Sequence, residues 1–162
     1  MTTSITRRLP VFDTDQHVVE PPELWEKYLD PDFRVLGKHA LWRHDGETNS
    51  YLKVNGKAVR DSMNPNIPRH AIWRPGMSWD DVGNLDASVR HKANEGAWNP
   101  RVRLADMDAM GVDQAFLYPT WFAEGFHLVS DPDTAAALAR AYNDWIADFC
   151  QAAPDRLFAA AM

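Results

Sequence analysis

Three short apolar segments, separated by stretches with helical periodicity, constrain the fold of this 162-residue chain more than any other feature. They are LPVFDTDQH at residues 9–17, VDQAFLYPT at 112–120 and LFAAAM at 157–162. Each contains an apolar run of strand length, which is typical of a strand buried on both faces. Because helical patterns precede the second and the third segment, their order predicts βαβ units and a parallel sheet.

The two helices between these strands have recognisable starts. The first is predicted to begin at Pro100, since Asn99 is a good N-cap and proline is tolerated at the first helical position. The second is predicted over residues 132–153, where large apolar side chains recur at helical spacing, with Ser130 or Asp131 as its N-cap. The fold class is therefore α/β.

Residues 37–98 differ in character and are predicted to be an insertion between the first strand and the first helix. Asp45-Gly46 and Asn55-Gly56 favour tight hairpin turns, so this part begins with a predicted small antiparallel β-meander. Residues 64–84 contain three prolines and little periodicity, which predicts a long irregular loop. Before the insertion, residues 23–29 are predicted to form a short helical turn.

The charge balance and the cysteine content exclude several kinds of partner and site. With 17 Lys and Arg against 23 Asp and Glu, the net charge of −6 argues against nucleic acid and anionic membrane as partners. The single cysteine, Cys150, excludes a disulfide framework and a cysteine-based metal cluster, and we expect it to be a buried, inert thiol. Residues 1–8 are polar and are predicted to be disordered. We expect a cytoplasmic protein, because the sequence shows no secretory signal and no apolar run near the ~20 residues of a membrane helix.

Polar side chains at the end of the first strand are the main candidates for chemistry. Asp13, Asp15 and His17 alternate, so all three are predicted to lie on one face, at the sheet edge where active sites of such folds lie. A carboxylate and an imidazole two residues apart can ligate zinc or manganese. Glu20 could be a further ligand, a partner of His17, or neither. The residues alone leave a second interpretation open, in which Asp15 and His17 only cap the strand end.

Further candidates follow the second strand, in a stretch, residues 121–130, that is predicted to be a loop. Thr120, Trp121 and His127 are predicted to line a substrate pocket, although Trp121 could instead plug the end of the sheet. In the inserted loop, Trp73 and Trp79 could cover a site or pack the loop onto the body of the protein.

Three blocks of sequence resemble the amidohydrolase-related family of metal-dependent enzymes. They are VFDTDQHVVEPPELWEKYLDP, RLADMDAMGVDQAFLYPT and AYNDWIADFCQAAPDRLFAAAM, in that order along the chain. The resemblance is to the branch that includes aminocarboxymuconate-semialdehyde, resorcylate and carboxyvanillate type decarboxylases, together with some hydrolases. The family opens with a strand that ends in an H-x-H, E-x-H or D-x-H pair and a Glu-Pro step. Here these are Asp15-Gln16-His17 and Glu20-Pro21.

The resemblance implies a TIM (β/α)₈ barrel whose strand ends hold a divalent metal, most often zinc and in some cases manganese. Asp15 and His17 would be ligands, and the substrate would be a small carboxylated or cyclic molecule that is decarboxylated or hydrolysed. The first ligand is Asp where the best-known zinc members have His, and the family's later ligands have no counterpart here. Full-length members are commonly homodimers.

A complete barrel takes ~250 residues, so about three of its eight strands are expected in this chain. Residues 9–162 are accordingly predicted to be an N-terminal part of the barrel, inactive alone, with the acid/base group beyond Met162. The alternative is a complete, small, non-catalytic α/β binding module that uses residues 37–98 as an interaction surface.

Overall fold

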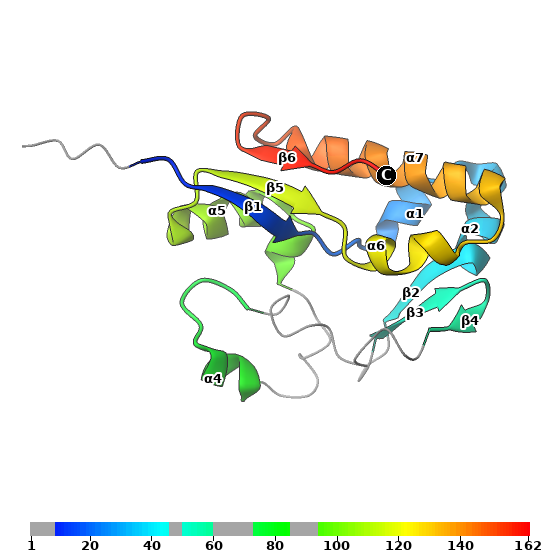
Figure 1. Cartoon of the computed structure of the whole chain (residues 1–162), viewed down its shortest axis with the longest axis horizontal. Helices are drawn as coiled ribbons and strands as arrows, with labels where there is room; N and C mark the ends of the chain where they lie inside the picture. Colours follow the sequence, from blue (N-terminus) through cyan, green and yellow to red (C-terminus); the bar gives the residue numbers. More distant parts are fainter. Residues whose placement is uncertain (1–8, 46–49, 60–72, 85–93) are drawn as a thin grey trace, which may run out of the picture.

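The computed structural model describes residues 9–45, 50–59, 73–84 and 94–162, and within them it contains two three-stranded sheets (Figure 1). Strands β1 (Phe12–His17), β5 (Gln114–Tyr118) and β6 (Leu157–Ala159) form a parallel sheet in the order β1-β5-β6. The predicted parallel sheet is thus confirmed. The predictions for residues 1–8 and for the turn after Asp45 concern residues outside the described ranges.

The pairing of β1 with β5 contains a bulge that changes which side chains share a face. Asp13 pairs with Ala115 and Gln16 pairs with Leu117, so three steps along β1 match two steps along β5. The extra residue interrupts the period of two. As a result Asp13 and Gln16 lie on the same face, whereas His17 lies on the other. The prediction that Asp13 and His17 share a face is therefore wrong.

Both predicted helices begin as expected. Helix α5 (Pro100–Met110) has Asn99 as its N-cap, and the Asn99 side chain accepts a hydrogen bond from the backbone N–H of Arg101. Helix α7 (Pro132–Cys150) is capped by Asp131, whose carboxylate accepts the N–H of Thr134. It ends at Cys150, three residues before the predicted end.

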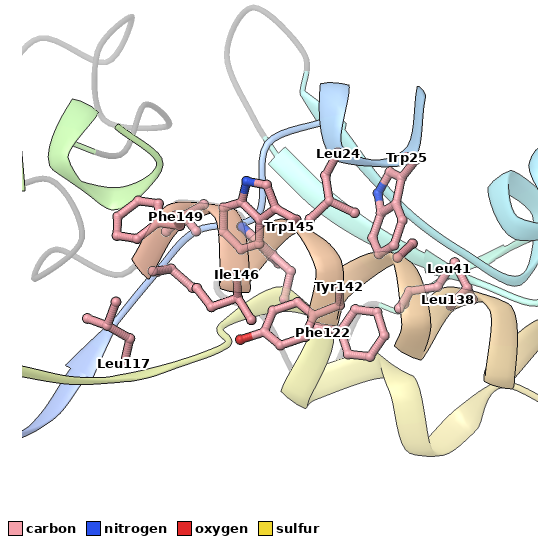
Figure 2. Packing of buried hydrophobic residues seen from close by; sticks show 14 of the residues in the cluster. Leu24, Trp25, Leu41, Leu117, Phe122, Leu138, Tyr142, Trp145, Ile146 and Phe149 are labelled. Carbon is pink, nitrogen blue, oxygen red and sulfur yellow. The ribbon is translucent and has the colours of Figure 1, made fainter. Parts of the chain in front are cut away.

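The core lies between α7 and the segments that it covers, as Figure 2 shows. Helix α7 buries its large apolar side chains, and the ring of Tyr142 stacks on Phe122 with a centroid distance of 5.1 Å. Phe122 also stacks on Trp25, at 5.7 Å, and on Phe126, at 4.7 Å. The α7 residues that were predicted to recur at helical spacing are all buried: Leu138, Tyr142, Trp145, Ile146 and Phe149.

The segment after β1 forms helices that pack on α7 and a separate antiparallel sheet. The short helix α1 (Glu23–Tyr28) confirms the predicted helical turn, and a 3-10 turn, η1 (Pro31–Phe33), leads into α2 (Arg34–Ala40), which was not predicted. The second sheet consists of β2 (Leu41–Asp45), β3 (Ser50–Val54) and β4 (Lys57–Ala58), which confirms the meander. Three of its side chains are buried in the main core, namely Leu41, Leu52 and Val54.

The predicted Asn55-Gly56 turn joins β3 to β4 and is fixed from two sides. Asn55 and Gly56 have φ values of 47° and 75°, as a tight hairpin turn requires. The Asn55 amide donates to the carbonyl of Leu128 at 2.7 Å. A Cβ on Gly56 would lie 2.5 Å from Cε1 of His39, so a side chain here would require the His39 ring to move.

Two short helices occupy stretches that were predicted to be irregular. In the inserted loop, α4 (Trp79–Gly83) begins with a capping box between Ser78 and Asp81, a local signal that the prediction overlooked. After β5, α6 (Trp121–Gly125) and the 3-10 turn η3 (Phe126–Leu128) replace the predicted loop. Thr120, at the N-cap of α6, makes no side-chain capping bond, so α6 lacks a local start signal.

The remaining element is η2 (Glu95–Ala97), a 3-10 turn directly before α5. None of the helices found in the described ranges is long and apolar enough to cross a membrane.

Candidate functional site

A cavity of about 250 Å³ opens at the carboxyl end of β1. The end of β1 forms one side, η2 and α5 form another, and the segment that precedes α4 adds an apolar wall. The lining residues are Asp13, Asp15, Gln16, His17, Val19, Trp73, Pro75, Asn94, Gly96, Ala97, Arg103, Asp106, Met110 and Thr120. The cavity therefore lies at the strand end where the sequence predicts a site.

Asp15 and His17 lie together at the mouth of this cavity. The distance between Oδ1 of Asp15 and Nε2 of His17 is 3.7 Å. Their side chains are 84% and 46% exposed, so both donor atoms can reach a ligand from solvent. Asp13 also lines the cavity, but it lies on the face of β1 opposite to His17.

Asp15 and His17 have the donor atoms of a transition-metal site, but they supply only two of the ligands that such a site needs. A carboxylate oxygen and an imidazole nitrogen are ordinary zinc or manganese ligands, and their spacing lets one ion contact both. Within the described parts of the chain, no group of three or more His, Cys, Asp or Glu side chains could hold a metal ion. The residues present fit two positions of a coordination shell.

The other ring nitrogen of His17 determines which tautomer the residue adopts. Nδ1 lies 3.1 Å from the backbone carbonyl oxygen of Pro119 and 3.3 Å from Oγ1 of Thr120. A carbonyl oxygen can only accept a hydrogen bond, so Nδ1 carries the proton and donates it. Nε2 is then left with its lone pair, on the side of Asp15. This is the arrangement of metal-ligating histidines, whose second nitrogen usually donates to a carbonyl or carboxylate.

Arg103 holds the backbone of the site and was missed by the sequence analysis. Its Nη2 donates to the carbonyl of His17 at 2.6 Å, its Nη1 to the side chain of Gln16 at 3.0 Å, and its Nε to the carbonyl of Gly96 at 2.8 Å. The sequence did contain a signal for Arg103, which lies near the start of α5. A helix that follows a parallel strand begins near the carboxyl end of that strand, so a side chain at its start can reach the site.

Glu20 is buried, with 3% of its surface exposed, and both of its oxygens accept backbone hydrogen bonds. Oε1 accepts from the N–H of Thr120 at 3.0 Å and of Phe122 at 3.3 Å, and Oε2 accepts from the N–H of Trp121 at 3.0 Å. Burial raises the pKa of the Glu20 carboxyl to about 7, although the backbone N–H groups oppose the rise. The carboxylate thus caps α6 from 100 residues away and does not join the Asp15–His17 pair as a third ligand among the described residues.

The remaining candidates separate into those at the cavity and those away from it. Thr120 lines the cavity and contacts His17. Trp121 is 4% exposed and belongs to the hydrophobic core, and His127 is an exposed residue of η3; neither is among the described residues that line the cavity. Trp73 lines it, with Nε1 donating to the carbonyl of Met77 at 2.6 Å, whereas Trp79 is 62% exposed.

Cys150 lies on α7 and is half-buried. Burial raises the pKa of its thiol to about 11. A thiol with so high a pKa is protonated at neutral pH, which agrees with the expected inert role.

Comparisons with known proteins find similarity among solved structures. No family model matches the chain, and no curated protein matches it. A solved crystal structure, that of an amidohydrolase from Mycobacterium avium subsp. paratuberculosis K-10, is similar with a TM-score of 0.61 and 20% sequence identity. The match covers 96% of this chain and 43% of that one. The chain therefore has a mixed α/β fold compatible with part of an amidohydrolase, and it spans less than half of the length of the amidohydrolase it matches.

Proposed function

We propose that this chain carries the first two ligands of the metal site of an amidohydrolase-type enzyme. In this proposal Asp15 and His17 hold a divalent cation, zinc or alternatively manganese, at the carboxyl end of β1. The observation that carries it is the 3.7 Å approach of Asp15 Oδ1 and His17 Nε2 beside a cavity, with His17 Nδ1 engaged by a carbonyl. The likeness to an amidohydrolase fold supports the same reading.

The cavity supports a small substrate, which we propose to be a carboxylated or cyclic molecule that is decarboxylated or hydrolysed. A bound cation would supply Lewis acidity toward a substrate oxygen or an activated water. The chain's own residues give the cavity two kinds of surface. Trp73 and Pro75 form an apolar wall suited to a flat ring, and Asn94 and Thr120 offer polar contacts.

We further propose that additional barrel strands complete this site. The face of the parallel sheet that carries His17 exposes large aromatic side chains: Phe12 is 49% exposed, and Tyr118 and Phe158 are 37% exposed each. Phe12 and Phe158 form an edge-to-face pair with centroids 6.1 Å apart. An apolar face of this kind is unusual on a protein surface unless something covers it. In a closed barrel the face would point inward, where later strands would bring the remaining ligands and the acid/base group.

The alternative, a small binding module that uses residues 37–98 as an interaction surface, has less support. Leu41, Leu52 and Val54 of the meander are buried in the main core, and the Asn55-Gly56 turn docks on residues 39 and 128. This half of the insertion is therefore part of the folded body. Size-exclusion chromatography separates the two proposals, since the module should be monodisperse, whereas a partial barrel should associate through its exposed aromatic face.

The test of the metal site is a cation titration followed by two-dimensional NMR. Zinc should shift, and manganese should broaden, resonances of Asp15, His17 and their neighbours at the cavity. Binding should be weak, because two ligands do not complete a tetrahedral site. Asp15→Ala and His17→Ala should each abolish the response, whereas His127→Ala, which removes another exposed imidazole, should not.

Two results would contradict the proposal. The first is a cation response that survives His17→Ala or is centred outside the cavity. The second is tight, stoichiometric zinc binding by the chain alone, which would show that the site is not the two-ligand site described above.

A further inference from the structure

We propose that Glu20 is a positioning residue for His17, acting through the Pro119–Phe122 segment. The proposal rests on the proposed function in one respect, namely that Nε2 of His17 is the atom that meets the cation. Glu20 does not line the cavity; it bonds the backbone N–H of Thr120, which does, and its effect on His17 is transmitted by backbone.

The first step in this chain of contacts is the anchoring of the backbone after β5. The Glu20 carboxylate accepts three successive N–H groups, those of Thr120, Trp121 and Phe122, at 3.0–3.3 Å. These are the donors at the start of α6, which has no cap of its own. Because Glu20 is buried, water cannot easily replace these bonds, and the segment has one favoured position.

The second step joins the anchored segment to the imidazole. The carbonyl of Pro119 and the hydroxyl of Thr120 both lie beside Nδ1 of His17, at 3.1 Å and 3.3 Å. A shift of this backbone would remove the acceptor that keeps the proton on Nδ1. An imidazole free in water favours the opposite tautomer, with the proton on Nε2, which would block the lone pair that a cation needs.

Two other contacts hold the main chain of His17. Arg103 donates to the His17 carbonyl, and the next residue, Val18, donates its N–H to the carbonyl of Tyr118 at 2.9 Å. Neither contact reaches the imidazole. The Asp15 carboxylate, 3.7 Å from Nε2, and the Tyr118 ring, with centroids 6.0 Å apart, do lie beside the imidazole, but neither offers an acceptor to Nδ1. The Nδ1–H tautomer therefore depends on the segment that Glu20 anchors.

The tautomer can be measured directly in the metal-free chain by long-range ¹H–¹⁵N correlation of the histidine rings. At about pH 8.5 this correlation distinguishes the two tautomers, because the protonated and the unprotonated nitrogen of a neutral imidazole have distinct shifts. His17 should be predominantly the Nδ1–H tautomer. In Glu20→Gln the amide NH₂ must face one of the backbone N–H groups, so the segment loosens and the Nε2–H form should become the major one.

Asp131→Asn is the matched control. It makes the same carboxylate-to-amide change in a residue that caps a helix, α7, but Asp131 does not contact the Pro119–Phe122 segment among the described residues. It should leave the His17 tautomer unchanged. A folded Glu20→Gln chain, checked by circular dichroism, that keeps the wild-type tautomer would overturn the positioning role.

A second measurement needs no variant and covers the case in which Glu20→Gln does not fold. The amides of Thr120, Trp121 and Phe122 should be protected from hydrogen exchange to a degree similar to core amides of α7. Exchange at the rate of unprotected amides would overturn the anchoring step. These outcomes are independent of the cation titration. If Glu20→Gln changes the His17 tautomer but no cation binds, only the proposed metal site is refuted, and the positioning role of Glu20 stands.

Discussion

The buried Glu20 carboxyl makes the stability of the fold depend on pH in a direction that can be worked out from the structure. Burial raises its pKa from 4.5 to about 7. A carboxyl group with a higher pKa in the folded chain binds its proton more tightly there than in the unfolded chain. Its contribution to stability is therefore full below about pH 4.5 and is lost as the pH rises through 7.

The size of this effect follows from the size of the shift. Each pKa unit corresponds to about 1.4 kcal/mol, so the rise to about 7 corresponds to about 3 kcal/mol between the two plateaus. That is a large fraction of the ~5–15 kcal/mol by which domains are usually stable. The wild-type chain should therefore be markedly more resistant to urea near pH 5 than near pH 8.

Urea unfolding at pH 5, 6, 7 and 8, followed by tryptophan fluorescence, measures the effect, and Glu20→Gln isolates it. Every other titratable group is shared by the two proteins, so the difference between their pH profiles belongs to Glu20. The free energy of unfolding of the variant should change by about 2.5 kcal/mol less than that of the wild type between pH 5 and pH 8, because part of the full effect is already lost below pH 5. Parallel profiles would refute the reasoning, because they would mean that the Glu20 pKa is the same in the folded and unfolded chains.

Two further predictions concern single side chains in the core and at a turn. The Tyr142 hydroxyl is buried and has no hydrogen-bond partner among the described residues, so Tyr142→Phe should leave the urea midpoint unchanged or raise stability by up to ~1 kcal/mol; a loss above ~1 kcal/mol would reveal a partner. Gly56→Ala should lower stability by roughly 1–3 kcal/mol, because φ is 75° and the new Cβ would meet His39. The same substitution at Gly76, where φ is 91° but nothing lies within 4 Å, should cost less, and equal losses would show that contact with His39 is unimportant.

The elements that could be predicted from the sequence are those whose signals are local. Asn99 and Asp131 are N-caps directly before proline, and they mark the starts of α5 and α7 correctly. The Asn55-Gly56 pair likewise sets its own turn through its own φ angles. For these elements the residues that decide the structure are neighbours in the chain, so pattern and propensity are sufficient.

The features that were missed depend on residues far apart in the sequence. Helix α6 is capped by Glu20, and the bulge in β1 is defined only by its register against β5. Asp15 and His17 could be proposed as a pair because they are close in sequence. Arg103 lies 86 positions from the carbonyl it binds, and its only signal was its place near the start of a helix that follows β1. The sequence pattern of β1 was thus enough to propose the candidate site, whereas the contacts that support it could be identified only from the fold.

Long-range contacts also explain how the candidate site can accommodate a large insertion between β1 and α5, the two elements that line it. The chain leaves β1 at His17 and returns to it at η2, where the N–H of Val19 donates to the carbonyl of Ala97 at 3.0 Å and Arg103 binds the carbonyl of Gly96. The intervening residues therefore start and finish at the same place. The entropic cost of closing a flexible loop rises by only ~0.6 kcal/mol for each doubling of its length. A few hydrogen bonds at this junction can offset that cost, so residues can be added between the meander and η2 while the junction maintains the geometry of Asp15 and His17.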